Sequence, residues 1–175
     1  VAARYPQPNW QPAGGWKVDP ALVYAHTLQE SRFQRTAVSP AGAEGLMQVR
    51  PGTARDVARW RSIGVNVSDL KSPEVNMELG QSYLQHLSRD PSTSGHLPKI
   101  IAAYNAGPAP VARWQTEIRD NGDPLLFMES IPYWETRGYV AIVLRNYWMY
   151  EAQQGKASET LEALAQGKWP KFPDG

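Results

Sequence analysis

The chain has 175 residues, a length that suits one domain with its own hydrophobic core. Its 18 basic and 17 acidic residues leave a net charge of +1, which disfavours binding to DNA or RNA. It has no cysteine, which excludes disulfides and thiolate metal sites, and no apolar run of about 18 residues that would span a membrane. The sequence starts at Val1 without a signal sequence or initiator methionine, so we expect a mature or excised fragment.

The beginning of the chain predicts an arm followed by a helix. Residues 1–17 are rich in proline and tryptophan and lack periodicity, which predicts an extended N-terminal arm, with the domain itself over residues 18–175. Asp19 and Pro20 are typical of a helix start, because aspartate caps free N–H groups and proline has none to lose. The apolar run after them predicts a core helix that ends at Ser31.

Glu30 is the first carboxylate of this helix and lies near its end. At helical spacing it shares a stripe with Val23 and Phe33, so we expect its side chain to face packed surface rather than bulk water. Burial favours the neutral form of a carboxyl group, and a neutral group can donate a proton as a general acid. Considered alone, a glutamate near a helix end is more often an ordinary solvated residue.

The rest of the chain is predicted to be helical, with loops rich in glycine and proline between the helices. The clearest amphipathic pattern places Val75, Leu79, Tyr83 and Leu87 four residues apart. No convincing alternating strand is found, so we predict an all-α fold, one helical domain with extended N- and C-terminal arms. The further predicted helices begin at Pro51 and Pro73, span 99–106, 111–118 and 135–151, and run from a Ser158 cap to Gly167, before an extended tail at 169–173.

Several kinds of chemistry find no support in the sequence. The histidines, His26, His86 and His96, are scattered, so a zinc site would need ligands from distant segments, and His26 is interpreted as a core residue. There is no cysteine nucleophile, no G-x-S-x-G elbow and no glycine-rich phosphate loop. We therefore predict no metal and no cofactor.

Four short motifs stand out along the chain: Glu30-Ser31, Gly45-Leu46-Met47-Gln48, Ala103-Tyr104-Asn105-Ala106-Gly107, and Ile131 to Val140. Taken together, these motifs resemble the soluble lytic transglycosylase family. Each is weak alone, but they occur in the family's order over about residues 18–150. The resemblance implies a lysozyme-like helical fold, related to goose-type lysozyme, that binds peptidoglycan glycan strands in the bacterial periplasm. It also implies a monomer and leaves room for an upstream domain of the same protein.

The activity that the resemblance implies is cleavage of the MurNAc–GlcNAc β-1,4 bond without water, which leaves 1,6-anhydro-MurNAc ends. Ordinary glycosidases use two carboxylates, so a single acid implies help from the substrate. In this interpretation Glu30 protonates the leaving oxygen, and the substrate's own 2-acetamido oxygen meets the charge at C1. Glu30 then takes the proton of the C6 hydroxyl, whose attack is favoured by proximity if water is kept away.

The resemblance assigns substrate binding to five further residues, and each has a structural alternative. Ser39 is expected to contact the N-acetyl group, but it is also typical of a turn before proline. Gln48 offers a donor and an acceptor to sugar hydroxyls. The Tyr104 hydroxyl is expected near Glu30, with a core position as the alternative. Asn105 is a binding residue or a helix cap, and Glu135 lies in the saccharide groove or is a first-turn acid that favours the helix dipole.

Departures from the family pattern keep other functions open. Some relatives have a groove methionine where this chain has Arg50, and Arg137 is either a surface partner of Glu135 or has another role. If Glu44 held a water, the enzyme would be a hydrolytic muramidase, although an acid in a glycine-flanked loop is usually solvated. A peptidoglycan-binding module without turnover is the third alternative, and the presence of Glu30 argues against it.

Overall fold

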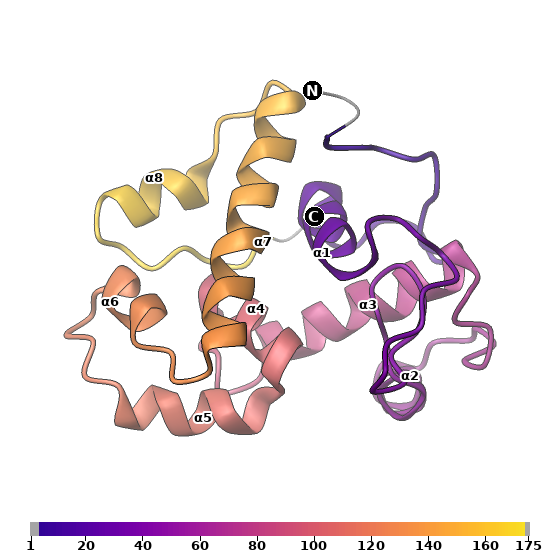
Figure 1. The fold of residues 1–175 in the computed structure, drawn as a ribbon, viewed down its shortest axis with the longest axis horizontal. Coiled ribbons are helices and arrows are strands. Elements are labelled where there is room, and N and C mark those ends of the chain that lie inside the picture. The colour runs from indigo at the N-terminus through magenta and orange to yellow at the C-terminus, as the bar shows by residue number, and fades with distance from the viewer. Residues whose placement is uncertain (1–3, 174–175) are drawn as a thin grey trace. The chain divides into compact units, whose positions relative to one another are not determined.

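The computed structural model describes residues 4–173. Residues 1–3 of the predicted arm and 174–175 at the end of the predicted domain lie outside this range. The described chain forms two compact units, 4–83 and Leu84–Pro173. Helices and isolated β-bridges make up its regular structure, so the predicted all-α class is confirmed (Figure 1). The division into an arm over 1–17 and a domain over 18–175 stays a prediction.

The first unit contains α1 (Pro20–Ser31), α2 (Pro51–Trp60) and the beginning of α3 (Pro73–Ser88), which continues into the second unit. The predicted start of α1 is confirmed, because Asp19 Oδ1 accepts a hydrogen bond from the Ala21 N–H at 3.0 Å. Leu22 and Val23 are fully buried, as an apolar core helix requires.

The end of α1 differs in one respect from the sequence prediction. The helix ends at Ser31 as expected, but Arg32 and Phe33 then adopt left-handed conformations with φ of 52° and 63°. The expected helical stripe of Glu30 and Phe33 is therefore wrong, because Phe33 is no longer on the helix. Its ring instead lies 6.1 Å from the ring of Tyr24, centroid to centroid.

Helix α3 is buried on more sides than its amphipathic pattern predicts. Leu79 is fully buried as expected, but so are the polar side chains of Asn76, Glu78 and Gln81, each at most 1% exposed. Buried polar groups need hydrogen-bond partners, and these come from loop segments elsewhere in the same unit. Helix α3 is thus the element onto which these segments are fixed.

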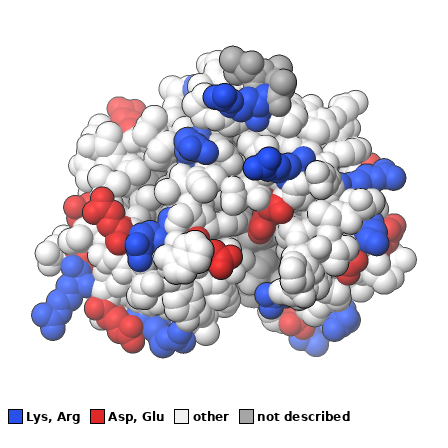
Figure 2. All heavy atoms as spheres, in the orientation of Figure 1, with Lys and Arg blue, Asp and Glu red and all other residues white. Residues whose placement is uncertain are grey.

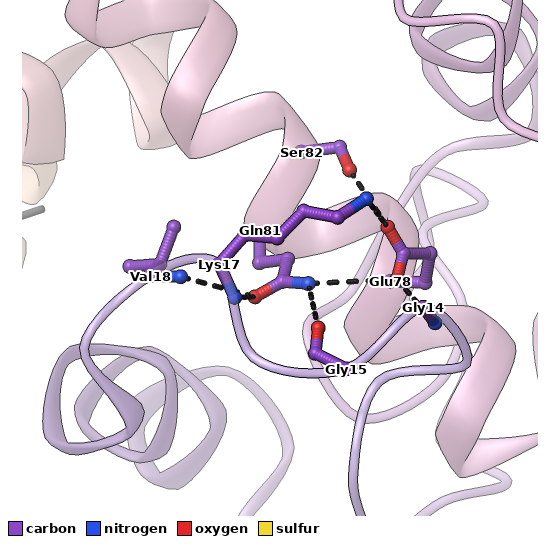
Figure 3. A network of polar contacts seen from close by, with 7 residues as sticks. All are labelled: Gly14, Gly15, Lys17, Val18, Glu78, Gln81 and Ser82. Atoms are coloured by element: carbon purple, nitrogen blue, oxygen red, sulfur yellow. Dashed lines mark hydrogen bonds and ion pairs between the residues drawn. The ribbon is translucent and has the colours of Figure 1, made fainter. Parts of the chain in front are cut away.

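A polar network fixes the segment before α1 onto α3. The Glu78 carboxylate accepts a hydrogen bond from Gly14 N at 2.7 Å and pairs with Lys17 Nζ at 3.2 Å. Gln81 accepts from Lys17 N at 3.0 Å and donates to Gly15 O at 2.8 Å. Because these partners satisfy a buried charge and a buried amide, the network fixes the chain where it enters α1. Figure 3 shows its residues: Gly14, Gly15, Lys17, Val18, Glu78, Gln81 and Ser82.

In the second unit α4 and α7 are the central pair. Helix α4 packs against α7 and α5, and α6 packs against α7 (Figure 1). The inward face of α7 contains Tyr139, Val143, Tyr147 and Tyr150, all of which are buried. The helices of this unit are α4 (Leu97–Ala106), α5 (Pro108–Glu117), α6 (Pro124–Glu129), α7 (Trp134–Gln153) and α8 (Glu159–Ala165).

Proline and cap residues account for the differences in helix bounds. Helices α4 and α5 begin earlier than predicted because Pro98 and Pro108 are accepted in their first turns. Helix α6 was not predicted, although Asp123 caps it by accepting from Leu125 N at 3.0 Å. The predicted Ser158 cap of α8 is confirmed by its contact with Leu161 N at 3.3 Å. None of the helices within residues 4–173 combines the length and hydropathy needed to cross a membrane.

The C-terminal tail is extended, as predicted, and it contacts the segment that leads into α4. Leu97 N donates to Pro170 O at 2.8 Å, and Phe172 N donates to Gly95 O at 3.0 Å. The His96 ring stacks on Trp169 with a centroid distance of 4.4 Å. These contacts fix the start of α4, whose other end carries Tyr104 and Asn105.

Candidate active site

Glu30 lies in the last turn of α1 and is half-buried. The neighbouring Ser31 is buried, and its hydroxyl donates a hydrogen bond to Leu46 O at 2.7 Å. Leu46 belongs to the Gly45–Gln48 motif, so the first two of the four motifs meet in the structure. The end of the helix that carries the candidate acid is therefore fixed to the loop after it.

The loop 37–49 is anchored on α3 through Asn76. Asn76 Oδ1 accepts from Met47 N at 2.7 Å, and its Nδ2 donates to Glu44 O at 2.8 Å and Leu70 O at 2.9 Å. Gly45 has φ +77°, and a Cβ there would overlap with Leu70 O and the Asn76 side chain. Only glycine fits this position, because the backbone conformation and the space both exclude a side chain.

Asn76 was not singled out from the sequence, although it determines where the loop lies. The signal was present as a polar residue three positions before Leu79, on the face of the helix that was expected to be apolar. Met47 adds a second anchor, since its side chain is fully buried and a Cβ on Gly80 of α3 would overlap with its sulfur. Polar and apolar contacts together thus fix the candidate binding loop rigidly on α3.

Ser39 and Gln48 make hydrogen bonds inside this loop. Ser39 Oγ accepts from Ala43 N at 3.0 Å, so its interpretation as a turn residue is confirmed and its hydroxyl hydrogen is left to donate. Gln48 has φ +53°, and its Nε2 donates to Ala37 O at 3.1 Å and Gly45 O at 3.0 Å. With both amide hydrogens used, Gln48 can offer a ligand its amide oxygen.

Glu44 and Arg50, the two residues of this region discussed above as departures from the family pattern, have different surroundings. Glu44 is half-buried, and its backbone pairs with Val49 through two hydrogen bonds of 3.0 Å. Arg50 is exposed at the start of α2 and makes no side-chain cap to the helix. An exposed arginine does not supply the packed apolar contact that a groove methionine gives.

Tyr104 and Asn105 lie near the end of α4 in the second unit. Tyr104 is half-buried, so it is not an ordinary core residue. Asn105 Oδ1 accepts from Thr136 Oγ1 at 2.7 Å, which links α4 to the first turn of α7. The alternative in which Asn105 caps α4 is wrong, because Gly107 N closes the helix by donating to Ala103 O at 2.8 Å.

Glu135 lies exposed in the first turn of α7, where an acid favours the helix dipole, as its structural alternative predicted. Arg137 does not serve as its surface partner. The Arg137 Nε instead donates to Ile131 O at 3.1 Å and orders the turn before α7. Within residues 4–173 the Glu135 carboxylate forms no ion pair.

The candidate residues therefore form two sets. Glu30, Ser39 and Gln48 belong to the first unit, and Tyr104, Asn105 and Glu135 belong to the second. Their roles in catalysis and binding, and the expected approach of Tyr104 to Glu30, stay predictions.

The part of the chain that the structure describes contains no cluster of three or more His, Cys, Asp or Glu residues that fits a metal ion. On the face shown in Figure 2, acidic and basic side chains alternate among uncharged residues.

Comparison with known proteins gives one consistent family. The model of the transglycosylase SLT domain matches residues 9–126. The soluble lytic murein transglycosylase of Escherichia coli is 36% identical over 156 residues, which cover 88% of this chain and 24% of that protein. The chain thus spans about a quarter of the length of this curated relative.

Comparison with solved structures gives the same family. The 70 kDa soluble lytic transglycosylase of Escherichia coli has a TM-score of 0.75 and 34% identity, covering 89% of this chain and 25% of that one. The lytic transglycosylase Slt of Pseudomonas aeruginosa, an inactive mutant in which glutamine replaces a glutamate, has a TM-score of 0.73 and 35% identity, covering 80% and 22% of the two chains.

Proposed function

Because this chain belongs to the transglycosylase SLT domain family, we propose that it is a peptidoglycan lytic transglycosylase. It cleaves the β-1,4 bond between MurNAc and GlcNAc without water and leaves 1,6-anhydro-MurNAc ends. The observation that carries the proposal is the 2.7 Å hydrogen bond from Ser31 Oγ to Leu46 O. This bond joins the Glu30-Ser31 motif to the Gly45–Gln48 loop, so a candidate acid and a candidate binding loop form one unit.

Glu30 supplies both proton transfers in this mechanism. In its acid form it protonates the glycosidic oxygen, and the bond from that oxygen to C1 of MurNAc breaks. The 2-acetamido oxygen of the same sugar meets the positive charge at C1. The Glu30 carboxylate then removes the proton of the C6 hydroxyl, whose oxygen bonds to C1 and displaces the acetamido oxygen. Glu30 ends in its acid form, ready for the next bond.

The other candidate residues bind and orient the glycan in this proposal. The hydroxyl hydrogen of Ser39 is left to donate to the acetamido oxygen, and the Gln48 amide oxygen is left to accept from a sugar hydroxyl. Tyr104 and Asn105 contact the sugars from the end of α4, and Glu135 from the start of α7. We extend the proposal to a monomer that acts on murein in the bacterial periplasm, as part of a longer protein.

The test is to digest purified peptidoglycan and weigh the muropeptides. We expect anhydro ends, lighter by one water than reducing ends. Glu30→Gln keeps the shape but removes the acid, and we expect its rate to fall by more than about a thousandfold. The matched control is Glu44→Gln in the loop that follows α1, which should retain activity.

Each other outcome rejects the proposal in favour of a named alternative. Reducing ends that disappear in Glu44→Gln would identify a hydrolytic muramidase that uses Glu44 to hold a water. Binding of peptidoglycan without products would identify a binding module. Full activity of Glu30→Gln would contradict the mechanism.

A further inference from the structure

The most exposed large apolar side chain of the described residues is Trp134, the first residue of α7, at 79% exposure. Its neighbour Tyr133 is 45% exposed, whereas Trp114 beneath it is only 2% exposed. Burying a tryptophan side chain contributes a large favourable free energy to folding. An indole as exposed as that of Trp134 therefore contributes little to the stability of the fold. Such residues are typical of binding surfaces.

The backbone under Trp134 is held in place from several sides. Ile131 is fully buried, and its carbonyl accepts from Arg137 Nε at 3.1 Å. The Tyr133 carbonyl accepts from Arg137 N at 2.9 Å, and the Tyr133 ring packs edge-on against Trp114 at 4.9 Å. An exposed ring on an ordered turn loses little conformational entropy when a ligand binds, so the site is preorganised.

Gly138 is the second observation, and it is independent of the first. It lies four residues after Trp134, one turn further along the same face of α7, and a Cβ built on it meets nothing within 4 Å. Glycine destabilises a helix interior relative to alanine, and no packing contact or positive φ requires it here. Because helical side chains lean toward the N-terminus, a side chain at 138 would cover part of the Trp134 surface.

A pyranose ring matches this surface chemically. One face of an N-acetylhexosamine presents C–H groups that pack flat on an indole, while its rim carries hydroxyl and acetamido groups. Polar groups share the first turn of α7 with Trp134, since Glu135 is the next residue and Thr136 Oγ1 donates to Asn105 Oδ1 at 2.7 Å. A carboxylate on the same helix turn disfavours binding to an anionic membrane surface, and one indole is too small for a stable protein interface.

We propose that Trp134 and the bare backbone at Gly138 form a stacking platform for one N-acetylhexosamine ring of a β-1,4-linked glycan. This inference rests on the proposed function, because it names where that substrate lies on α7. In this proposal Trp134 is a binding residue, and Gly138 acts by leaving room for the glycan chain.

The first experiment titrates the protein with tetra-N-acetylchitotetraose and follows the tryptophan indole N–H signals by NMR. The signal missing from Trp134→Phe identifies Trp134, and we expect it to shift on titration. Trp134→Ala should bind the tetrasaccharide about tenfold more weakly, and Trp134→Tyr should stay within about threefold of the wild type. An unshifted Trp134 signal, or unchanged affinity of Trp134→Ala, would overturn the platform.

The second experiment separates binding from folding. Gly138→Gln places a good helix former in open space, so the Tm should rise by about 2 to 3 °C while affinity falls about tenfold. The matched control is Ala152→Gln, an exposed position of the same helix about 21 Å further along, which should bind normally. Normal affinity in Gly138→Gln would contradict the role given to glycine.

These measurements do not depend on turnover. A wild type that shows the indole shift but releases no anhydro ends would contradict the proposed reaction and leave the platform standing. A wild type that releases anhydro ends without the shift would overturn the platform alone.

Discussion

The loop 37–49 and the start of α7 differ in how they use their polar and aromatic groups. In the loop, Ser39 and Gln48 pair with backbone groups of the loop itself, Met47 is fully buried, and Asn76 of α3 accepts from the Met47 N–H. At the start of α7, Trp134 projects into solvent. A rigid loop with its polar groups satisfied is suited to holding a neighbouring acid in an accurate position. An exposed aromatic surface is suited to binding a long polymer.

The largest effect expected from this difference is that of Gly45→Ala. The new Cβ would overlap with Leu70 O and the Asn76 side chain at a residue with φ +77°. We expect a loss of more than about 4 kcal/mol in the free energy of unfolding, measured by urea denaturation, together with loss of activity. The control in the same loop is Gly42→Ala, which has φ +84° but open space, and should lose only about 1 kcal/mol. Equal losses would show that the loop is not closely packed at Gly45.

Asn76→Ala tests the polar anchor of the same loop. It leaves Met47 N, Glu44 O and Leu70 O without their side-chain partner in a buried place. We expect a loss of about 3 kcal/mol by urea denaturation and faster hydrogen exchange at the Met47 amide. A loss below about 1 kcal/mol would mean that the loop keeps its conformation without Asn76.

The pH dependence of stability tests α1, the helix behind the loop. His26 is fully buried, and this burial lowers its pKa from 6.5 to about 4, against the opposing effect of its hydrogen bond with Leu22 O. Between these two pKa values the unfolded chain binds the proton and the folded chain does not. Stability should therefore fall as the pH falls through this window, by up to about 3 kcal/mol.

The control for this prediction is His26→Leu, which removes the titrating ring. Its stability should fall less between pH 6.5 and 4 than that of the wild type, whatever its value at neutral pH. Part of the slope should remain, because burial also lowers the pKa of His96, and the charges of Lys99 and Lys171 add to this shift. Parallel pH profiles of the two proteins would refute the assignment to His26.

The smallest expected effect on stability is that of Trp134→Ala at the start of α7. Because the side chain is 79% exposed, its removal should change the free energy of unfolding by less than about 0.5 kcal/mol. A large loss of stability by urea denaturation would show that Trp134 supports the fold, and would remove the contrast between the two regions.

Local signals in the sequence predicted the starts of the two helices α1 and α8 correctly. Asp19 and Ser158 cap helices as expected, because a cap depends on residues two or three positions away. Helix α6 was missed because its Asp123-Pro124 start lies in a run of turn-forming residues. The left-handed Phe33 was missed because sequence spacing carries no sign of where a helix turns into the left-handed region.

The buried polar residues of α3 were beyond local reasoning for a different reason. Asn76 meets Met47 across 29 positions, and Glu78 meets Gly14 across 64. Helical spacing places Asn76 on the apolar face of α3, three positions before Leu79, but only the distant segments show what covers Asn76 and Glu78. In the candidate site, the motif residues could be named from the sequence, but the hydrogen bonds that occupy Ser39 and Gln48 could not.

The hydrogen bond from Ser31 to Leu46 has a consequence for anyone who transfers this chemistry to another helical scaffold. In the proposed mechanism Glu30 reacts with the sugar, while the serine after it holds the helix end against its loop. A designer who copies the glutamate alone leaves it on a frayed terminus. The transplant must include the hydroxyl and a carbonyl placed to receive it, so the smallest transferable part is a helix end together with a loop.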